Sequence, residues 1–154
     1  VGDGCDGDIY TIAIDSASNV LFMGGAFLSC GNVSTPYIAS YDIANASYAS
    51  LGVPLTGPVN KIVVSSGGWS TLYVGGNFTV TDGSGQTVSN AAIYQSNTNE
   101  WSSLGNPNAP IRAIALQGDV VYLGGDFTTI GGESISGLAV KAGDYFLPID
   151  GAPT

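Results

Sequence analysis

The sequence predicts an all-β fold, and three observations support this prediction. Only 10% of the 154 residues are charged, while 44% are hydrophobic and 23 are glycine, so the long charged residues that favour helices are scarce. Val, Ile, Tyr, Phe and Thr occur in short runs that Gly, Asn, Asp and Ser interrupt, as in strands joined by tight turns. The same order of runs recurs three times. The length suits one domain, so we expect residues 1–154 to form a single repeat domain.

The clearest recurring motif is a pair of glycines followed, one residue later, by phenylalanine. It returns at intervals of roughly fifty residues. The three copies are Gly24, Gly25 and Phe27; Gly75, Gly76 and Phe78; and Gly124, Gly125 and Phe127. We expect a structural role for all nine residues, because glycine allows close backbone approach or a positive φ angle and phenylalanine supplies core. Prolines cluster where one repeat meets the next, which predicts repeats at residues 1–57, 58–109 and 110–154.

Each repeat contains four predicted strands. Alternating runs at 9–14, 59–64 and 111–116 come first, and apolar triplets at 21–23, 72–74 and 121–123 lead into the glycine pairs. Third strands follow a polar loop at 37–41, 91–94 and 137–141. A fourth strand begins at an aromatic residue that we expect in the core, with stacking on a sugar ligand as the alternative: Tyr48, Trp101 or Tyr145. Turn residues between the runs favour antiparallel sheets, and four antiparallel strands in a repeat of this length are typical of a β-propeller blade.

Three blades are fewer than the four or more of known closed propellers. Four arrangements therefore stay open: the chain is a piece of a longer protein, copies combine, the repeats stack as an open array, or three repeats close alone. The chain begins at Val1 without an initiator methionine or signal peptide, and residues 147–154 resemble the inter-repeat linkers. We expect a chain cut at a repeat boundary, whose partners are other copies of itself or adjacent repeats.

The pattern around the glycine pair resembles a known family. An apolar residue, Tyr, an apolar residue, Gly-Gly, Asn or Asp, Phe and Thr stand at 72–79 and 121–128, and Trp-Ser-Ser-Leu-Gly follows at 101–105. This order is similar to the extracellular propeller repeats of fungal cortical polarity markers and related secreted kelch-like proteins. The resemblance implies a blade-like fold, an extracytoplasmic location and a role in cell-surface or wall architecture. It implies no catalytic residues.

Two further features point to an extracellular or cell-surface location. Acceptor triplets for N-linked glycans begin at Asn32, Asn45 and Asn77, each in a segment expected at the surface. Such triplets also arise by chance in a chain rich in Ser, Thr and Asn. Cys5 and Cys30 are the only cysteines, and we expect a disulfide between them, with two free thiols as the alternative.

Charge and residue types exclude several functions. The formal charge is −9 with three cations, so no nucleic acid partner is expected, and no apolar run approaches the roughly 20 residues of a membrane span. Histidine is absent, which removes Ser-His-Asp and Cys-His catalysis and histidine-ligated metals. Glu100 and Glu133 lie in turn-like segments, and Asp3, Asp6 and Asp8 lack the spacing of a calcium loop. We expect no enzymatic activity, no metal and no cofactor.

The sequence therefore favours a secreted, glycosylated structural protein that builds a surface scaffold or filament with further copies or repeats. The alternative is a propeller-type binding module that recognises glycans or cell-surface proteins. Particle size in solution distinguishes the two, because only the first predicts large or filamentous assemblies.

Overall fold

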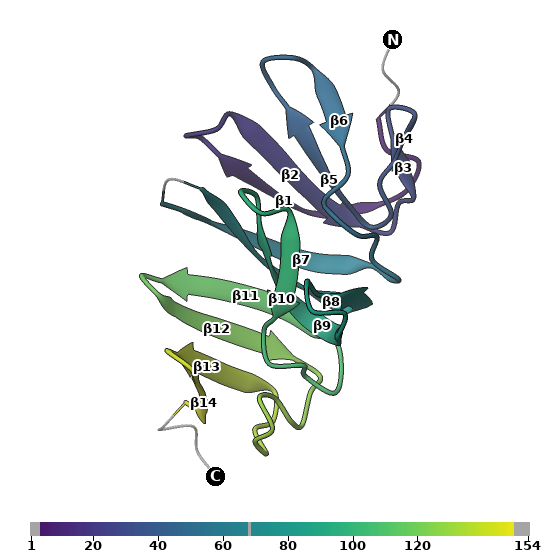
Figure 1. Cartoon of the computed structure of the whole chain (residues 1–154). Coiled ribbons are helices and arrows are strands. Elements are labelled where there is room, and N and C mark those ends of the chain that lie inside the picture. The colour runs from purple at the N-terminus through teal and green to yellow at the C-terminus, as the bar shows by residue number, and fades with distance from the viewer. Residues whose placement is uncertain (1–3, 68, 150–154) are drawn as a thin grey trace.

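The computed structural model describes residues 4–67 and 69–149, and every regular element in these ranges is a β-strand. Three four-stranded antiparallel sheets follow one another in a curved stack, with the N-terminal sheet at the top of Figure 1. The all-β prediction, with a four-stranded antiparallel sheet in each repeat, is confirmed. The sheets do not close into a ring within the described ranges. None of the described segments forms a helix with the length and apolar character needed to cross a membrane.

The first sheet has the order β1-β2-β5-β6. Its strands are β1 (Ile9–Asp15), β2 (Val20–Gly25), β5 (Ile38–Asp42) and β6 (Ser47–Ala49). A small hairpin, β3 (Ser29–Cys30) with β4 (Val33–Ser34), separates β2 from β5.

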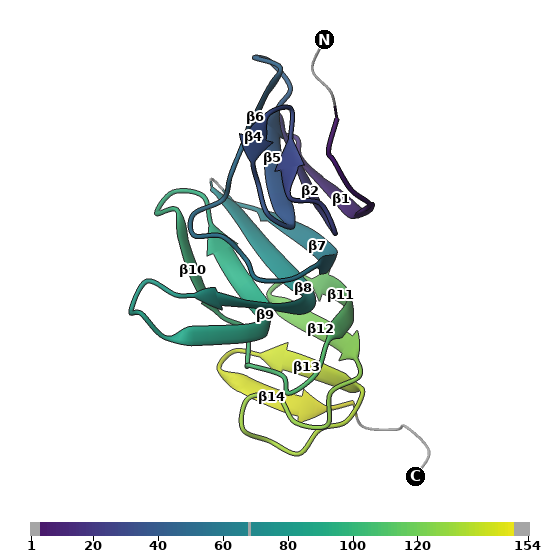
Figure 2. The same ribbon diagram turned by 90° about the vertical axis from the view of Figure 1, so that its right-hand side faces the viewer.

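The second and third sheets repeat this order. The second contains β7 (Val59–Ser66), β8 (Ser70–Thr81), β9 (Thr87–Gln95) and β10 (Glu100–Ser103). The third contains β11 (Ile111–Gln117), β12 (Val120–Gly125), β13 (Leu138–Ala142) and β14 (Tyr145–Pro148). In the second sheet, β8 and β9 continue past the glycine pair and end in a hairpin that projects to the left in Figure 2.

One register is shared by all three sheets. The opening residue of the first strand pairs with the second glycine of the motif, and the register shifts immediately afterwards, which marks a β-bulge. The pairs are Ile9 with Gly25, Val59 with Gly76 and Ile111 with Gly125. The three predicted opening strands are therefore equivalent, as the sequence repeat requires. The repeat boundaries near residues 57 and 109 stay a prediction.

Two apolar layers join the sheets. In the first layer, Phe22 of the first sheet and Leu51, which follows β6, meet Val59, Ile62 and Leu72 of the second sheet, and all five are buried. The second layer joins Leu104, which follows β10, to Ile111, Ile114 and Leu123 of the third sheet and to Phe127, which follows β12. The motif phenylalanines are buried: Phe78 in the first layer, Phe127 in the second and Phe27 in a smaller cluster on the first sheet.

The aromatic residues predicted in the fourth strands differ in burial. Trp101 is buried and Tyr48 is half-buried, but Tyr145 is 74% exposed, so its predicted core position is wrong. The register explains the difference. Phe146 pairs with Lys141, just as Trp101 pairs with Tyr94, and it is Phe146 that packs against the second apolar layer.

Candidate functional site

The second glycine of each motif lies against the start of its own sheet. A Cβ on Gly25, Gly76 or Gly125 would be 2.9 Å from the Cα of the paired opening residue, and closer still to a backbone carbonyl oxygen of the preceding linker. Real Cβ atoms do not approach so closely. None of the six motif glycines has a positive φ angle, so close backbone approach, and not unusual backbone conformation, is the reason for glycine here.

The first glycine of each motif has a different neighbour, because it faces the next sheet. A Cβ on Gly24 would lie 2.9 Å from Cβ of Val59, and a Cβ on Gly75 would lie 2.9 Å from Cβ of Ile111. Val59 and Ile111 are both fully buried. The opening residue of one sheet thus occupies the space that a side chain on the first glycine of the preceding sheet would need.

Gly124 breaks this pattern. Apart from its chain neighbours, the described atoms nearest to a Cβ built on Gly124 are Cβ of Ala113 in β11 at 3.7 Å and the carbonyl oxygen of Gly137, just before β13, at 3.9 Å. No described residue of a following sheet fills the space. At the other end of the stack, Ile9 is the opening residue equivalent to Val59 and Ile111, and it is 45% exposed.

The side of β1 that faces away from the second sheet forms one uncovered apolar surface. We call it the front face and define it as Ile9, Ile12 and Ile14, of which Ile12 is 64% and Ile14 is 55% exposed. By register, Ile12 is equivalent to Ile62 and Ile114. Those two side chains are only 2% and 5% exposed because a preceding sheet covers them. The front face therefore carries the same residue types as the buried layers, but no described sheet packs against it.

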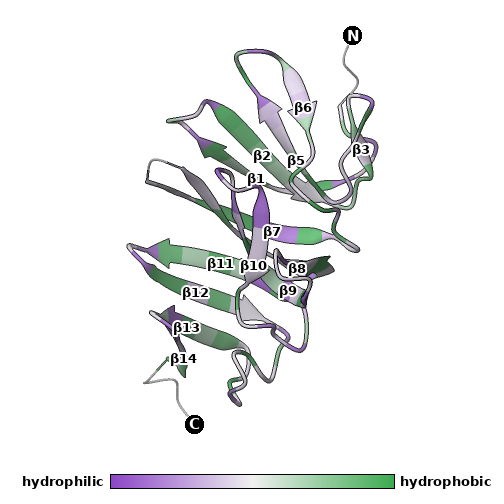
Figure 3. Cartoon of the chain, in the orientation of Figure 1, coloured by the Kyte–Doolittle hydropathy of each residue, from purple (hydrophilic) through white to green (hydrophobic). Residues whose placement is uncertain are grey.

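The outer side of the third sheet is the second uncovered surface. We call it the rear face and define it as Tyr122, Gly124, Leu138, Val140 and Leu147. Leu138 and Leu147 are 47% and 49% exposed, and Tyr122, Val140 and Leu147 line an open hollow of about 520 Å³. Figure 3 shows hydrophobic strands at both ends of the stack, in β1 and in β13 and β14.

Polar side chains cross the layer between the first two sheets. The backbone N–H of Ile62 donates to Oγ1 of Thr11 at 3.1 Å. The Ser70 hydroxyl donates to the carboxylate of Asp15, both groups being buried. This hydrogen bond is the main cause that lowers the pKa of Asp15 below its usual value of 3.8. These contacts fix the position of one sheet on the next, which apolar contacts alone do less strictly.

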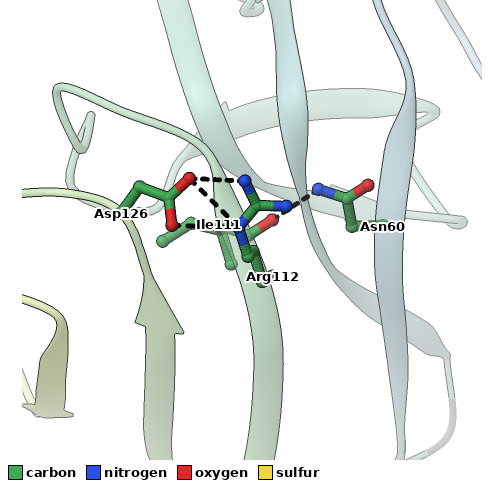
Figure 4. Close-up of polar contacts among 4 residues, drawn as sticks. All are labelled: Asn60, Ile111, Arg112 and Asp126. Carbon is green, nitrogen blue, oxygen red and sulfur yellow. Dashed lines mark hydrogen bonds and ion pairs between the residues drawn. The ribbon is translucent and has the colours of Figure 1, made fainter.

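A related contact joins the second sheet to the third. The amide Nδ2 of Asn60 donates to the carbonyl oxygen of Ile111 at 2.9 Å (Figure 4). Arg112 holds the equivalent position in the third sheet, where its Nε and Nη2 donate to both carboxylate oxygens of Asp126. The pair lowers the pKa of Asp126 and raises that of Arg112, in each case mainly through these hydrogen bonds.

Sequence reasoning did not identify a side-chain hydrogen bond that recurs in all three repeats, which we call the side-chain lock. Asp6, Thr56 and Asn108 each stand three residues before an opening residue. Each accepts a hydrogen bond from the backbone N–H that follows the motif phenylalanine. The donors are Leu28 at 2.8 Å, Thr79 at 2.8 Å and Thr128 at 2.8 Å. The three lock residues differ in type, so only their constant spacing and their shared side-chain oxygen could have shown the repeat.

The N-terminal segment is attached to the first sheet by a disulfide. Cys5 and Cys30 form the predicted bond, and Cys30 is buried with Met23, Phe27 and Ala39. Beside it, Asp6 also accepts from the N–H of Ser29 at 3.0 Å. This bond and the one from Leu28 lower the pKa of Asp6. Asp6 is thus a structural acceptor in the first sheet.

The three asparagines of the glycosylation triplets have exposed side chains. Asn32 lies in the turn between β3 and β4, Asn45 in the turn between β5 and β6, and Asn77 within β8. Ala26 and Asp126, which replace Asn77 in the other two repeats, are also exposed, as expected for the variable position of the motif. The side-chain nitrogen of Asn45 donates to Asp42 at 2.8 Å. Glycan attachment stays a prediction at all three positions.

The acidic residues considered for chemistry lie apart in the fold. Glu100 begins β10, whereas Glu133 lies in the loop between β12 and β13, and both are exposed. Asp3 lies outside the described residues. Within residues 4–67 and 69–149, no group of three or more His, Cys, Asp and Glu side chains could hold a metal ion.

The chain was compared with known proteins. A family model described as the Rax2 C-terminal beta propeller domain matches residues 2–119, which is more than half of the chain. The match covers the first two sheets and the opening strand of the third. It confirms the resemblance to the propeller repeats of fungal cortical polarity markers. No curated protein matches the chain.

Proposed function

The chain belongs to the Rax2 C-terminal beta propeller family, and from this premise we propose that it is a secreted, glycosylated structural module. In this role it forms part of a surface scaffold or filament and is completed by further copies of itself or by further repeats. The proposal includes no catalytic step. It uses a propeller-type sheet stack as a building block.

The two uncovered faces are the observation that carries the proposal. Ile9, Ile12 and Ile14 are between 45% and 64% exposed at one end, and Leu138 and Leu147 are about half exposed at the other. Fully burying one such side chain is worth about 1.5 to 3 kcal/mol. Soluble monomers rarely leave contiguous apolar patches larger than a few hundred Å² in water. A partner that covers both ends therefore lowers the free energy of the assembled state.

The expected location follows from covalent chemistry. Disulfides such as Cys5–Cys30 form and persist in oxidising compartments. The three acceptor triplets present their asparagines on the surface, as attachment of an N-linked glycan requires. Both features support secretion, and the family supports a role in surface architecture.

Native material tests the proposal directly. We expect sedimentation to show particles much larger than one 15.5 kDa chain, and mass spectrometry to find N-linked glycan on the peptide that contains Asn77. The alternative function is a binding module for glycans or surface proteins. A native monomer without glycans that binds a glycan saturably would overturn the structural role and establish that alternative.

A further inference from the structure

We propose that the rear face of one chain binds the front face of a second copy, head to tail, with Ile9 of one copy seated over Gly124 of the other. This inference rests on the proposed function and specifies its partner. The occupant of the open space at Gly124 is the opening residue of another first sheet.

The two internal layers of the chain are the template for this contact. In each, a first glycine of the motif faces a β-branched opening residue of the next sheet: Gly24 faces Val59, and Gly75 faces Ile111. Gly124 has the same place in the third sheet, where a Cβ would meet Cβ of Ala113 at 3.7 Å, an ordinary van der Waals contact, and no described residue of another sheet. Ile9 is the opening residue that has no such glycine within the described chain. Gly124 of one copy and Ile9 of the next would therefore form the same kind of contact as Gly75 and Ile111.

The neighbouring positions agree with this geometry. Ile12 would enter a layer in which its equivalents Ile62 and Ile114 are 2% and 5% exposed. On the rear face, Leu138 would become covered as its equivalents are: Ile38 is 3% and Ala91 is 0% exposed. At the positions of Ile9, Ile12 and Leu138, the two faces therefore carry apolar side chains whose equivalents are buried where the sheets of one chain meet.

A polar contact extends the same argument. Asn60 donates across the internal layer to the carbonyl oxygen of Ile111, and Arg112 holds the position of Asn60 in the third sheet. In the head-to-tail contact, Arg112 lies beside the carbonyl of Ile9 of the next copy, while Asp126 keeps its guanidinium in place (Figure 4). A second copy thus meets both an uncovered glycine, equivalent to those at the internal layers, and a hydrogen-bond donor beside it.

The front and rear faces differ, so the contact is heterologous. Such a contact leaves one front face and one rear face free in every dimer. Repeated addition then either closes a ring or extends a filament, depending on the rotation between copies. An isologous contact between two front faces would stop at a dimer.

Two single variants block one face each. Gly124→Val puts a branched side chain on the rear face, at a position without positive φ where a Cβ meets only ordinary van der Waals contacts in the isolated chain. Ile12→Glu puts a charge on the front face, where the isolated chain exposes this side chain. Both variants should unfold at nearly the same denaturant concentration as the unmodified chain. We expect each to weaken self-association at least about 100-fold, since a lost apolar contact or a buried unpaired charge costs several kcal/mol.

Mixing the two variants is the decisive experiment. The Ile12→Glu chain keeps an intact rear face, and the Gly124→Val chain keeps an intact front face, so the mixture should form dimers of one chain of each kind. Sedimentation velocity and native mass spectrometry of the mixture, with differently labelled chains, measure this. Each variant alone should stay monomeric at the same concentration.

The other outcomes would overturn the inference, and they distinguish its failure from failure of the proposed function. If the unmodified chain associates but the mixture does not form mixed dimers, or if neither variant weakens association, another surface makes the contact. The proposed structural function then survives. If the unmodified chain stays monomeric at every concentration, a second copy is not the partner. The size of the native particle then decides whether the proposed function fails too.

Discussion

The side chain of Ile111 occupies the space over Gly75 that a Cβ would need, since the two Cβ positions would lie only 2.9 Å apart. This contact lies in the layer between the second and third sheets, and Gly24 makes the equivalent contact with Val59 between the first and second. The repeat therefore does more than reproduce a sheet. It places a glycine on one side of each sheet and a β-branched residue on the other, so that successive sheets fit together.

The first prediction compares equivalent glycines. Gly75→Ala should destabilise the chain by about 1 to 3 kcal/mol, because an added methyl group overpacks the layer around Ile111. Gly124→Ala should change stability by less than about 1 kcal/mol, and in the stabilising direction, because the space is open and glycine weakens a strand. Urea unfolding of both variants measures the difference. Equal effects at the two positions would contradict the proposed role of the sheet-to-sheet contact.

Much of this fold could be predicted from the sequence. The alternating runs and the glycine pairs identified the strands, because strand period and turn chemistry are local properties. The burial of Phe27, Phe78 and Phe127 followed from recurrence once in every repeat. Tyr145 was misplaced because the turn before β14 has two residues where the turn before β10 has four, so that Tyr145 aligns with Glu100 and its neighbour Phe146 aligns with Trp101. Adjacent residues of a strand point to opposite sides.

Contacts between sheets could not be predicted in this way. Asp15 and Ser70 are far apart in the sequence, and each reads locally as a turn residue, so nothing in either segment indicates their hydrogen bond. The open space at Gly124 is also invisible in the sequence, since its motif matches those at Gly24 and Gly75. Only the arrangement of the sheets shows that, among the described residues, no residue of another sheet lies against the third glycine.

The second prediction concerns pH. The hydrogen bond from Ser70 lowers the pKa of Asp15 below 3.8 in the folded chain, so the ionised carboxylate stabilises the fold. Its contribution is complete above the unfolded value of about 3.8 and is lost as pH falls through the lower folded value. Ser70→Ala should therefore cost about 1.5 to 3 kcal/mol near pH 7, and the difference from the unmodified chain should shrink in strong acid.

Chemical denaturation at several pH values measures this dependence. Ser96→Ala is a matched control, because Ser96 contacts the backbone of Ser70 at 3.1 Å without touching Asp15. A Ser70→Ala penalty that stays constant from pH 7 to pH 2 would show that the hydroxyl acts through packing alone.

The third prediction tests the side-chain lock. Asn108 accepts from the N–H groups of Thr128 and Thr129 at 2.8 and 3.1 Å. Asn108→Ala should destabilise the chain by about 1 to 2 kcal/mol, because two backbone donors lose a protein partner at a site that water still reaches. Asn108→Asp keeps the acceptor oxygen and should lose less. Hydrogen exchange at Thr128 and Thr129 reports the same change locally, and unchanged protection in the alanine variant would contradict the lock.

The fourth prediction concerns the disulfide. Cys5 and Cys30 are 25 residues apart in sequence, so reducing the bond should cost about 3 kcal/mol on the chain-entropy description. Because Cys30 is packed with Met23, Phe27 and Ala39, loss of the bond should loosen the first sheet before the other two. Hydrogen exchange with and without reductant, compared across the three sheets, measures the order. Uniform loss of protection would show that the three sheets unfold as one unit.

The fifth prediction concerns salt and the assembly of copies. Every chain carries a formal charge of −9, so two approaching copies repel each other over long range, while the front and rear faces attract only at contact. Salt shortens the screening length from about 30 Å at 0.01 M to about 8 Å at 0.15 M. We therefore expect association to strengthen as salt rises through this range, as sedimentation at fixed protein concentration can measure. Sulfate should strengthen association further than chloride, because sulfate also favours apolar burial.

The association of the Arg112→Gln variant should depend more strongly on salt. Removing this cation leaves Asp126 unpaired and raises the repulsion between copies at the edge of the contact. Association that weakens steadily with added salt would mean that ion pairs, and not the apolar faces, hold the copies together.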